Sequence, residues 1–296
     1  MRIGIIHYRK QPPWSAEQLI RAARELGHEP VYIRIQDIDA GLLGGRPTAF
    51  LHRERLVLDA AVVRGIGLSY THELFLKRID TLHVLEDLFP LINPVVGIIR
   101  ARDKWLSLYL LAKNGVPVPD TFITENPFTA KRLVEKYGRM VYKPLTGSLG
   151  LGSTLISDPE IGFQVMRSLS NYNQPGYLQE YVEKPGYDIR VFVVGGRVVA
   201  AMKRVSTGGW KTNIAQGARG VELREKDDPE AYELGIRAAE ILGLEYAGVD
   251  IVVDSETGRR LVIEVNAFPI WRGLQEATGR NPAKDIIMHL IELTRR

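Results

Sequence analysis

A single stretch, residues 247–266, constrains the fold of this chain most strongly. Its two halves are rich in apolar and β-branched residues, and the segment between them carries Asp, Ser, Thr and Gly, which is the pattern of a β-hairpin. If the strands pair symmetrically about that turn, Asp250 lies opposite Glu264 and Val252 lies opposite Val262. One face of the hairpin is then wholly apolar and should cover a core. Its residues are Val249, Ile251, Val253, Leu261, Ile263 and Val265.

The opposite face of the hairpin gathers three oxygen-bearing side chains, Asp250, Glu264 and Asn266. Directly opposed carboxylates destabilise a strand pair, so this arrangement favours a cation between them. Two carboxylates and an amide oxygen are hard ligands, which suit Mg²⁺ or Mn²⁺ rather than zinc. The alternative is an ordinary hairpin whose polar face is hydrated. A shift of the register by one residue would also separate the three groups.

The composition narrows the class of protein. The chain has 296 residues, enough for two or three domains. It has no cysteine, which excludes disulfides, cysteine nucleophiles and thiolate metal sites and fits a cytoplasmic protein. No apolar run approaches the roughly 20 residues that span a bilayer, and the polar residues after Met1–His7 argue against a signal peptide. The net charge of +4 suits anionic small molecules or an acidic partner, and it is not concentrated in a nucleic-acid-binding tail.

Residues 1–95 alternate between strand and helix patterns, which predicts a small open parallel sheet. The expected strands are 2–7, 31–35, 56–63 and 90–93, and the expected helices are 15–26, with Ser15 as its N-cap, and 71–85. No Gly-x-Gly-x-x-Gly follows the first strand, so the pattern does not indicate a dinucleotide-binding domain. Ligands of such sheets bind beyond the carboxyl ends of the strands. Arg64 occupies one of these ends and is the best candidate there for a substrate carboxylate, with a solvated loop residue as the alternative.

The middle of the chain contains a strand that ends in a lysine and is followed by a glycine-rich loop. The strand is 140–143 and the loop is 146–152, with another strand at 153–156. Glycines let backbone N–H groups approach phosphate oxygens. Lys143 precedes the glycines and no helix follows them directly, so this is not a Walker A loop. A glycine-rich connection without a function is the alternative. Helices are expected at 94–114 and 129–137, and a strand at 121–124.

A second hairpin is centred on residues 195–196, between two β-rich runs. Asp188 and Arg190 lie two residues apart on its first strand and so share a face. The partner strand brings Lys203 and Arg204 back toward them. Cations on adjacent strands repel unless an anion lies between them, so an anion site is expected here. An exposed strand face of mixed charge is the alternative. After this hairpin, residues 206–221 have the composition of a mobile loop that closes over a substrate.

These motifs together resemble the ATP-grasp ligases over essentially the whole chain, and most closely the RimK-type group that ligates amino acids to a carboxylate. The residues that carry the resemblance are Lys104, Lys143, the 147–152 loop, Gln179–Val182, Asp188, Arg190, Lys203, Arg204, Asn213, Asp250, Glu264 and Asn266. The resemblance implies an α/β (α+β) fold of the ATP-grasp type, preceded by an open α/β domain. It divides the chain into a substrate-side domain at 1–95, a central subdomain with the glycine-rich flap at 96–176 and a C-terminal subdomain with the metal site at 177–296.

The resemblance also implies a role for each motif. Cofactor-binding residues would be Lys104, Lys143, Gly147, Ser148, Gly150, Gly152, Glu180, Tyr181, Val182 and Asp188, which hold the phosphates, the adenine edge and the ribose side of ATP. The catalytic groups facing the γ-phosphate and the acyl phosphate would be Arg190, Lys203, Arg204 and Asn213. The ligands of two Mg²⁺ ions, for which Mn²⁺ can substitute, would be Asp250, Glu264 and Asn266, with Glu264 as the bridge.

The chemistry implied by the resemblance is an ATP-dependent ligation. A carboxylate attacks the γ-phosphate of ATP to give an acyl phosphate and ADP, and an amine then displaces phosphate. Cations and metal are needed because two anions must approach each other. The implied partners are an amino acid and a carboxylate acceptor, and neither nucleic acid nor a membrane is expected. Because members of the family commonly form dimers or tetramers, a homo-oligomer is compatible with the resemblance.

Several acceptors are compatible with the resemblance: a pterin or deazaflavin cofactor ending in glutamate, a ribosomal protein tail, or the acidic carrier protein of a lysine pathway. The last type usually shows an Asn-Thr-Ala-Arg-Gly-Gly-like run, from which residues 213–219 depart. We therefore expect L-glutamate to be added to a cofactor such as tetrahydromethanopterin or to a protein C-terminus. A 2-aminoadipate ligase and a non-catalytic ATP-binding regulator are the alternatives. Lys211, Arg219 and Arg272 are hypothesised to meet the carboxylates of the incoming amino acid.

Overall fold

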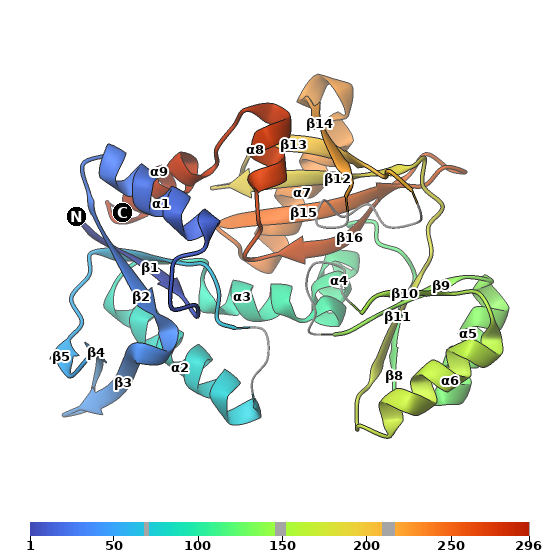
Figure 1. The fold of residues 1–296 in the computed structure, drawn as a ribbon, viewed down its shortest axis with the longest axis horizontal. Helices are drawn as coiled ribbons and strands as arrows, with labels where there is room; N and C mark the ends of the chain where they lie inside the picture. Colours follow the sequence, from blue (N-terminus) through green and yellow to red (C-terminus); the bar gives the residue numbers. More distant parts are fainter. Residues whose placement is uncertain (68–70, 146–151, 209–216, 296) are drawn as a thin grey trace.

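The computed structural model describes residues 1–67, 71–145, 152–208 and 217–295. Its N-terminal part is built on a parallel sheet with the strand order β2-β1-β6-β7 (Figure 1). The strands are β1 (Arg2–His7), β2 (Glu29–Arg34), β6 (Ala60–Val63) and β7 (Leu91–Ile92), and the helices that alternate with them are α1 (Trp14–Glu25) and α2 (His72–Leu88). The predicted parallel sheet is thus confirmed. The N-cap of α1 is Pro13 rather than the predicted Ser15, which lies buried inside the helix.

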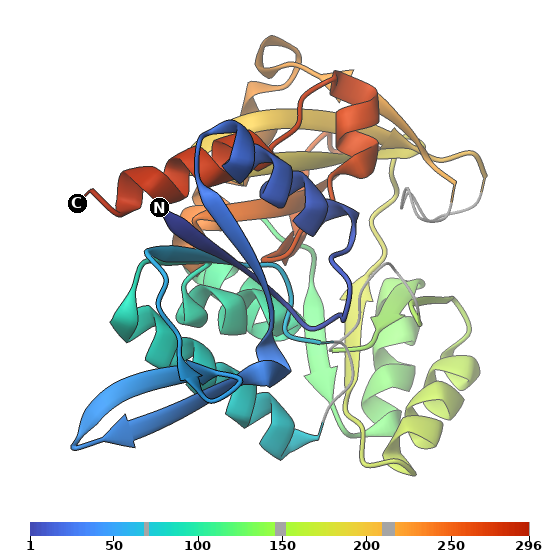
Figure 2. The same ribbon diagram turned by 60° about the vertical axis from the view of Figure 1, so that its left-hand side comes forward.

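A three-stranded antiparallel sheet, unassigned by the sequence analysis, interrupts this pattern. It consists of β3 (Ile38–Leu43), β4 (Arg46–Leu51) and β5 (Glu54–Arg55), and it follows the short 3₁₀ helix Ile35–Asp37. The β3–β4 turn uses Gly44 and Gly45, both with positive φ. Figure 2 shows this hairpin extending away from the rest of the fold. Because β6 begins only at Ala60, the predicted strand 56–63 is too long at its start.

Two helices connect the N-terminal sheet to the rest of the chain, where the sequence analysis expects one. They are α3 (Val95–Arg102) and α4 (Lys104–Lys113). Asp103 separates them because its backbone is extended and its carboxylate accepts a hydrogen bond from the N–H of Leu106 at 3.0 Å, which caps α4. This break makes Lys104 the first residue of α4.

The middle of the chain forms an antiparallel sheet with the order β10-β9-β11-β8. Its strands are β8 (Thr121–Thr124), β9 (Met140–Lys143), β10 (Thr154–Ile156) and β11 (Gly176–Glu180). The helices α5 (Pro127–Tyr137) and α6 (Pro159–Ser170) lie side by side against it (Figure 1). A separate small core joins sheet and helices, with Met140, Met166 and Leu178 fully buried at its centre.

The C-terminal part is a five-stranded antiparallel sheet with the order β14-β13-β12-β15-β16. Its strands are β12 (Tyr187–Val194), β13 (Arg197–Val205), β14 (Arg219–Leu223), β15 (Tyr246–Val253) and β16 (Arg260–Asn266). The 3₁₀ turn Glu225–Asp227 leads into α7 (Pro229–Leu242), which covers one face. The other face carries α8 (Arg272–Thr278) and α9 (Ala283–Leu293), and α9 packs beside α1.

A β-bulge corrects the predicted register of the 247–266 hairpin. Asp250 does lie opposite Glu264, as predicted, but Ile263 is the extra residue on β16, so Val262 faces Ile251 and Val252 faces Leu261. An inserted residue moves every following side chain to the other face. The core face therefore contains Val249, Ile251, Val262 and Val265, with Val253 packed at its margin. The prediction that Leu261 and Ile263 belong to this face is wrong.

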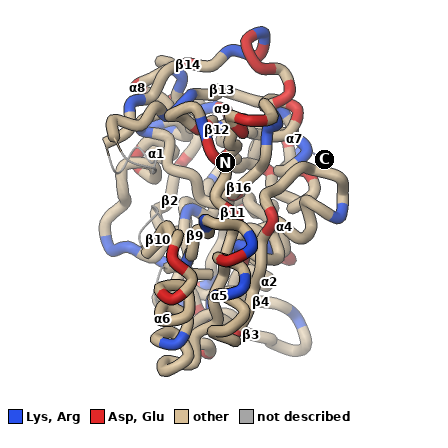
Figure 3. The backbone as a smooth tube through the Cα atoms, turned by 90° about the vertical axis from the view of Figure 1, so that its right-hand side faces the viewer, with Lys and Arg blue, Asp and Glu red and all other residues tan. Residues whose placement is uncertain are grey.

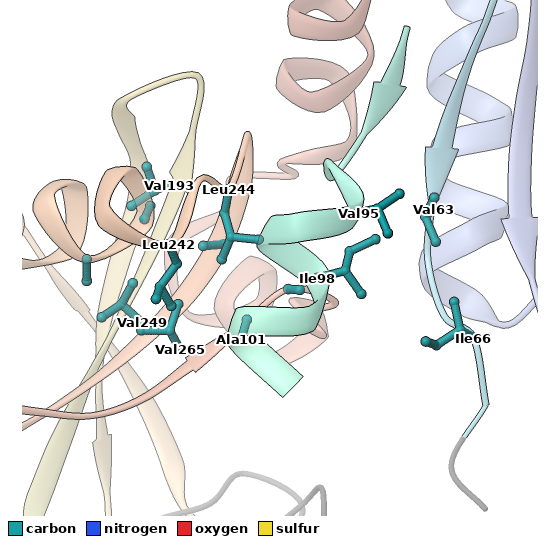
Figure 4. Close-up of a cluster of buried hydrophobic side chains, with 14 of the residues drawn as sticks. Val63, Ile66, Val95, Ile98, Ala101, Val193, Leu242, Leu244, Val249 and Val265 are labelled. Atoms are coloured by element: carbon teal, nitrogen blue, oxygen red, sulfur yellow. The ribbon is translucent and has the colours of Figure 1, made fainter. Parts of the chain in front are cut away.

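One core cluster runs from the N-terminal sheet into the C-terminal sheet. Figure 4 shows Val95 and Ile98 of α3 between Val63 and Ile66 on one side and the C-terminal sheet on the other. Because this cluster joins residues on both sides of position 95, the three-part division of the chain stays a prediction. In the described residues, no helix has the length and apolar character needed to cross a membrane. Basic and acidic segments alternate in all parts of the described chain (Figure 3).

Burial makes His7, at the end of β1, a source of acid sensitivity. The side chain is 6 % exposed and its Nδ1 accepts a hydrogen bond from the N–H of Arg9 at 2.9 Å. Burial, reinforced by Arg64 and Arg9, lowers the pKa of His7 to about 4. Between the ordinary value near 6.5 and pH 4, the unfolded chain therefore binds a proton that the folded chain does not. The free energy of unfolding should fall as the pH falls through this window, by at most about 3 kcal/mol.

Urea unfolding at pH 7 and pH 4.5 tests this expectation. Replacing His7 with Gln should reduce the difference between the two pH values, whereas the same change at the exposed His72 should leave it as in the wild type. An equal pH dependence in the His7→Gln variant and the wild type would contradict the assignment.

Candidate active site

Four charged residues form an ion-pair network on one face of the C-terminal sheet. The register places Asp188 opposite Arg204 on β12 and β13, and Arg190 opposite Asp250 on β12 and β15. Arg204 Nε and Nη2 donate to the Asp188 carboxylate at 2.6 and 2.8 Å, and Arg204 Nη2 also lies 3.2 Å from Asp250 Oδ1. Arg190 binds both oxygens of Asp250, with Nη2 to Oδ2 at 2.9 Å. The arrangement is therefore a chain of alternating charges, Asp188–Arg204–Asp250–Arg190.

Electrostatics favour the ionised forms of Asp250 and Arg204 in this network. Burial favours the neutral acid at Asp250, but the charges of Arg190 and Arg204 hold the pKa of its carboxyl below the usual range. Burial likewise opposes the charge on Arg204, and the carboxylates of Asp188 and Asp250 raise its pKa. Gly248 permits the packing, because a Cβ there would lie 3.0 Å from Arg190 Nη1 and 2.7 Å from Pro269 Cβ. The anion expected between neighbouring cations is thus supplied by the chain's own carboxylates.

Lys203 lies on the other face of the sheet. Its register partner is Ile189, which belongs to the core beneath α7, and its Nζ is 4.5 Å from the centre of the Tyr187 ring. Arg204, the next residue, points to the opposite face because side chains alternate along a strand. The structure therefore brings Arg190 and Arg204 together with Asp250 and separates Lys203 from them.

Glu264 is the carboxylate of the metal-ligand trio that remains available. It lies opposite Asp250, and Asn266 lies opposite Gly248 two pairs further along, where its Nδ2 is 3.5 Å from the Gly248 carbonyl oxygen. Among the described residues no cation forms an ion pair with Glu264, whereas both oxygens of Asp250 are bound by arginines. These oxygen donors fit Mg²⁺. The described residues contain no cluster of three His, Cys, Asp or Glu that could hold a metal ion, so Asn266 would have to complete the set.

Two lysines face Glu264 from the central sheet and from α4. Burial lowers the pKa of Lys143 to about 8, and Glu264 partly opposes the shift. Burial also lowers the pKa of Lys104, again opposed by Glu264, and its Nζ donates to the Leu145 carbonyl at 3.4 Å. Both cations are thus held at the junction of the central and C-terminal sheets, where they are only partly balanced by a carboxylate.

The sequence analysis assigned no individual role to two polar residues near these lysines, Gln179 and Lys184. Gln179 is 3 % exposed, and its Oε1 accepts a hydrogen bond from Lys143 Nζ at 2.6 Å while its Nε2 donates to Thr121 and Tyr177. It therefore positions Lys143. Lys184 is half-buried, and burial lowers its pKa while Asp188 and Asp250 oppose the shift. Gln179 lies within the Gln179–Val182 motif and Lys184 lies just after it. Their position at this motif is the only sequence feature that could have indicated a role for them.

The segment that would read the adenine edge follows β11. The N–H of Glu180 donates to the Asp120 carbonyl at 2.8 Å and the N–H of Tyr181 donates to the Arg139 carbonyl at 3.2 Å. Within the described chain, the N–H of Val182 has no backbone acceptor. Of the three predicted adenine-reading positions, Val182 therefore has the amide best placed to serve a ligand.

Several predicted residues lie outside the described part of the chain. These are Gly147, Ser148 and Gly150 of the flap, and Lys211 and Asn213 of the 206–221 loop. Gly152 is described and has a φ of 77°, which favours glycine. The end of the 206–221 segment is strand β14 rather than loop.

Arg64 is engaged inside the protein rather than presented to a ligand. Its Nη2 donates to the Pro269 carbonyl at 2.8 Å and to Ser15 Oγ at 3.2 Å, and its guanidinium lies 4.8 Å from the centre of the Trp271 ring. The side chain is 4 % exposed. Arg64 thus ties the carboxyl end of β6 to the C-terminal part of the chain, which corrects the interpretation of this residue as a carboxylate receptor.

Comparison with known proteins identifies the family of this chain. The RimK-like ATP-grasp domain matches residues 101–290. A probable alpha-L-glutamate ligase from Aliivibrio fischeri is 34 % identical, over 99 % of this chain and 96 % of that protein. The tetrahydromethanopterin:alpha-L-glutamate ligase of Methanosarcina acetivorans is 32 % identical, over 94 % of this chain and 95 % of that protein. Among solved structures, the ATP-grasp ligase PsnB in complex with a precursor variant, Mg and ADP has a TM-score of 0.76 and 21 % identity, covering 99 % of this chain and 98 % of that one.

The fold and the site together define an ATP-grasp ligase. The chain belongs to the RimK-like ATP-grasp family, whose members are ADP-forming ligases that use ATP and Mg²⁺. The fold predicted from the sequence is confirmed by the likeness to ATP-grasp structures.

Proposed function

We propose that this protein adds L-glutamate, or a closely related amino acid, to a carboxylate acceptor by way of an acyl phosphate, with release of ADP and phosphate. The observation that carries the proposal is the convergence of Lys104, Lys143, Arg190 and Arg204 around the opposed carboxylates Asp250 and Glu264. The relatives named alpha-L-glutamate ligases support glutamate as the amino acid. The use of ATP supports the cytoplasmic location expected from the sequence.

The proposed division of labour follows the geometry. Lys143, positioned by Gln179, and Lys104 would bind the phosphates of ATP, and the N–H of Val182 would bind the adenine edge. Arg190 and Arg204 would offset the charge that develops when the acceptor carboxylate attacks the γ-phosphate. Asp188 and Asp250 would hold these two guanidinium groups in place, because each accepts bidentate hydrogen bonds from one of them.

Magnesium is proposed to be held by the oxygens of Glu264 and Asn266 together with Asp250, whose carboxylate also accepts hydrogen bonds from Arg190. When bound, Mg²⁺ would offset the negative charge of the triphosphate and orient it for in-line transfer. Mn²⁺ has similar ligand preferences and should substitute. We do not assign a catalytic role to Lys203, because it lies on the other face of the sheet.

For the acceptor we propose a small cofactor that ends in glutamate, of the tetrahydromethanopterin type, or a protein C-terminus. The relative from Methanosarcina acetivorans, named for the first of these substrates, supports that choice. Both acceptors offer a carboxylate at the end of a flexible chain, which is what the acyl-phosphate chemistry needs.

A substrate matrix tests the proposal. ATP and Mg²⁺ would be supplied with L-glutamate, 2-aminoadipate or lysine, each against a reduced pterin with a glutamyl tail, a deazaflavin glutamate and acidic C-terminal peptides. We expect ADP release that depends on one amino acid and one acceptor, with a product heavier by one glutamyl residue in mass spectrometry. Bound ATP without turnover in every combination would instead indicate a non-catalytic regulator, and a mass gain of 2-aminoadipate would identify the lysine-pathway activity.

The low pKa of Lys143 predicts a pH limit for ATP use. Because its pKa in the free enzyme is about 8, Lys143 loses its charge, and its attraction for phosphate, as the pH rises through that value. We expect kcat/KM for ATP to fall above about pH 8, since this parameter reports groups of the free enzyme. Replacing Lys143 with Arg should remove this fall, because a guanidinium stays protonated. The same fall in the Arg variant would show that another group causes it.

A further inference from the structure

We propose that the depression lined by Trp14, Arg272, Gln275 and Glu276 binds the incoming α-amino acid through its carboxylate and its ammonium group. Its volume is about 460 Å³, which lies within the range of small-molecule sites. The inference rests on the proposed function, because an amino acid is a substrate only if the protein is a ligase of this type. It selects Arg272 from the three cations considered in the sequence analysis and adds the groups that would receive the amine.

The depression lies on the catalytic face of the C-terminal sheet. Gly220 of β14 is the register partner of Arg204, and a Cβ on Gly220 would meet the Gly273 carbonyl oxygen at 3.3 Å and the Ala277 Cβ at 2.9 Å. Helix α8, which carries three of the four lining residues, therefore packs on the face that bears Arg204 rather than on the face of Lys203. An amino acid bound here would lie on the same side of the sheet as the arginines assigned to the acyl phosphate.

The walls of the depression are held in place by packing. The guanidinium of Arg272 lies over the ring of Trp14, 5.0 Å from its centre. Trp14 in turn packs against the fully buried Trp271 with ring centroids 5.8 Å apart. Gln275 is fixed through its backbone N–H, which donates to the Trp271 carbonyl at 2.8 Å. The cation of Arg272 and the ring of Trp14 are thus supported by packing, and the main chain at Gln275 is held by the helix.

The chemistry of the lining groups selects a zwitterion. Within the part of the chain that the structure describes, Arg272 and Glu276 take part in no ion pair. The Oε1 atom of Gln275 is buried, and among the described residues it has no hydrogen-bond donor. A buried acceptor without a donor is unfavourable unless a ligand supplies one. An ammonium group supplies such a donor and also suits Glu276, while a carboxylate suits Arg272. The carboxylate tail of the acceptor lacks an ammonium group and would be repelled by Glu276.

Binding and kinetics of designed variants test this site. Binding of L-glutamate would be measured by calorimetry in the presence of ADP and Mg²⁺, and the KM for L-glutamate would be measured with the acceptor found in the substrate matrix. The variants are Arg272→Ala, Glu276→Gln and Gln275→Met, which removes the amide acceptor at similar length. Arg280→Ala is the matched control, because Arg280 is exposed and lies outside the depression.

We expect the Arg272→Ala change to weaken L-glutamate binding and raise its KM at least tenfold, with the KM for ATP unchanged within twofold. Glu276→Gln and Gln275→Met should each have a smaller effect in the same direction, and Arg280→Ala should have none. Analogues locate the bound carboxylate. Relative to L-glutamate, 4-aminobutanoate lacks the α-carboxylate and 2-aminobutanoate lacks the side-chain carboxylate. The wild type should prefer L-glutamate to one or both analogues. The Arg272→Ala variant should lose the preference that depends on the carboxylate bound by Arg272.

Three negative results distinguish failure of the site from failure of the proposed function. If the wild type forms product and Arg272→Ala keeps both the KM for L-glutamate and the preferences of the wild type, the amino-acid site is overturned while the proposed ligase function stands. If the wild type binds no L-glutamate, the site is also overturned. If no acceptor and amino acid support ADP release, the proposed function itself fails, and the site fails with it.

Discussion

Replacing Glu264 with Gln should reduce ADP formation at least 10³-fold while changing the affinity for ATP by less than tenfold. The substitution keeps the size of the side chain and removes the carboxylate that, among the described residues, is free of an ion pair. Metal binding at this position is expected to supply several kcal/mol of transition-state stabilisation, and about 4 kcal/mol corresponds to the predicted loss. ATP binding should persist because Lys104, Lys143 and the Val182 amide are unchanged.

The control for this prediction is Glu256→Gln, which alters an exposed carboxylate in the turn of the same hairpin. Steady-state ADP release and equilibrium binding of a non-hydrolysable ATP analogue measure the two quantities separately. A Glu264→Gln enzyme with turnover within tenfold of the wild type would contradict the assignment of Glu264 as a metal ligand. Equal losses in both variants would indicate damage to the hairpin.

Replacing Arg204 with Met should lower the free energy of unfolding by about 3–5 kcal/mol, because it leaves the Asp188 carboxylate buried without its bidentate partner. Both side chains are nearly inaccessible, so water cannot take the place of the guanidinium. The double variant Asp188→Asn with Arg204→Met should be more stable than Arg204→Met alone, because it removes the buried carboxylate that has lost its bidentate guanidinium.

Urea unfolding at neutral pH measures these differences. Arg224 and Asp227 form an exposed ion pair with a separation of 3.1 Å, so Arg224→Met is a matched control and should cost less than about 1 kcal/mol. If Arg204→Met cost no more than Arg224→Met, the network would not be the buried electrostatic support that we describe. Turnover by Arg204→Met should also fall, because the guanidinium is assigned to the reacting phosphate.

The sequence predicted that the Asp250 and Glu264 carboxylates face each other, because one local feature determines their pairing. A short polar turn between two apolar runs sets the register near the turn, and Asp250 and Glu264 lie opposite each other as expected. The bulge at Ile263 was not predictable from alternation, because an inserted residue depends on how the sheet twists against its neighbours. Because of the bulge, Val262 lies on the core face, and the predicted Leu261 and Ile263 do not.

The limits of pattern reasoning are clearest at Lys203 and Arg204. Both are cations at the end of one strand, and the sequence gives no direct sign of which of them shares a face with Asp188, Arg190 and Asp250. The answer depends on the pairing of β12 with two neighbours, which places Asp188, Arg190 and Asp250 on the face of Arg204. A buried carboxylate network of this kind forms between residues distant in sequence and has no local signature.

At Arg64, contacts distant in sequence again determine what the side chain does, and here they contradict the role that the local pattern predicts. A cation at the carboxyl end of a parallel strand has the pattern of a ligand-binding residue, but a distant carbonyl, that of Pro269, and the ring of Trp271 occupy it. The helix expected at 94–114 failed for a local reason, because the capping preference of Asp103 outweighed a continuous helical pattern.

The most direct test of the central claim follows oxygen from the acceptor to phosphate. An acceptor labelled with ¹⁸O in its carboxylate would be incubated with the enzyme, ATP, Mg²⁺ and L-glutamate, and the released phosphate would be analysed by mass spectrometry. An acyl phosphate predicts one ¹⁸O atom in each phosphate, together with ADP and an amide product. Unlabelled phosphate, or release of AMP and pyrophosphate, would contradict it.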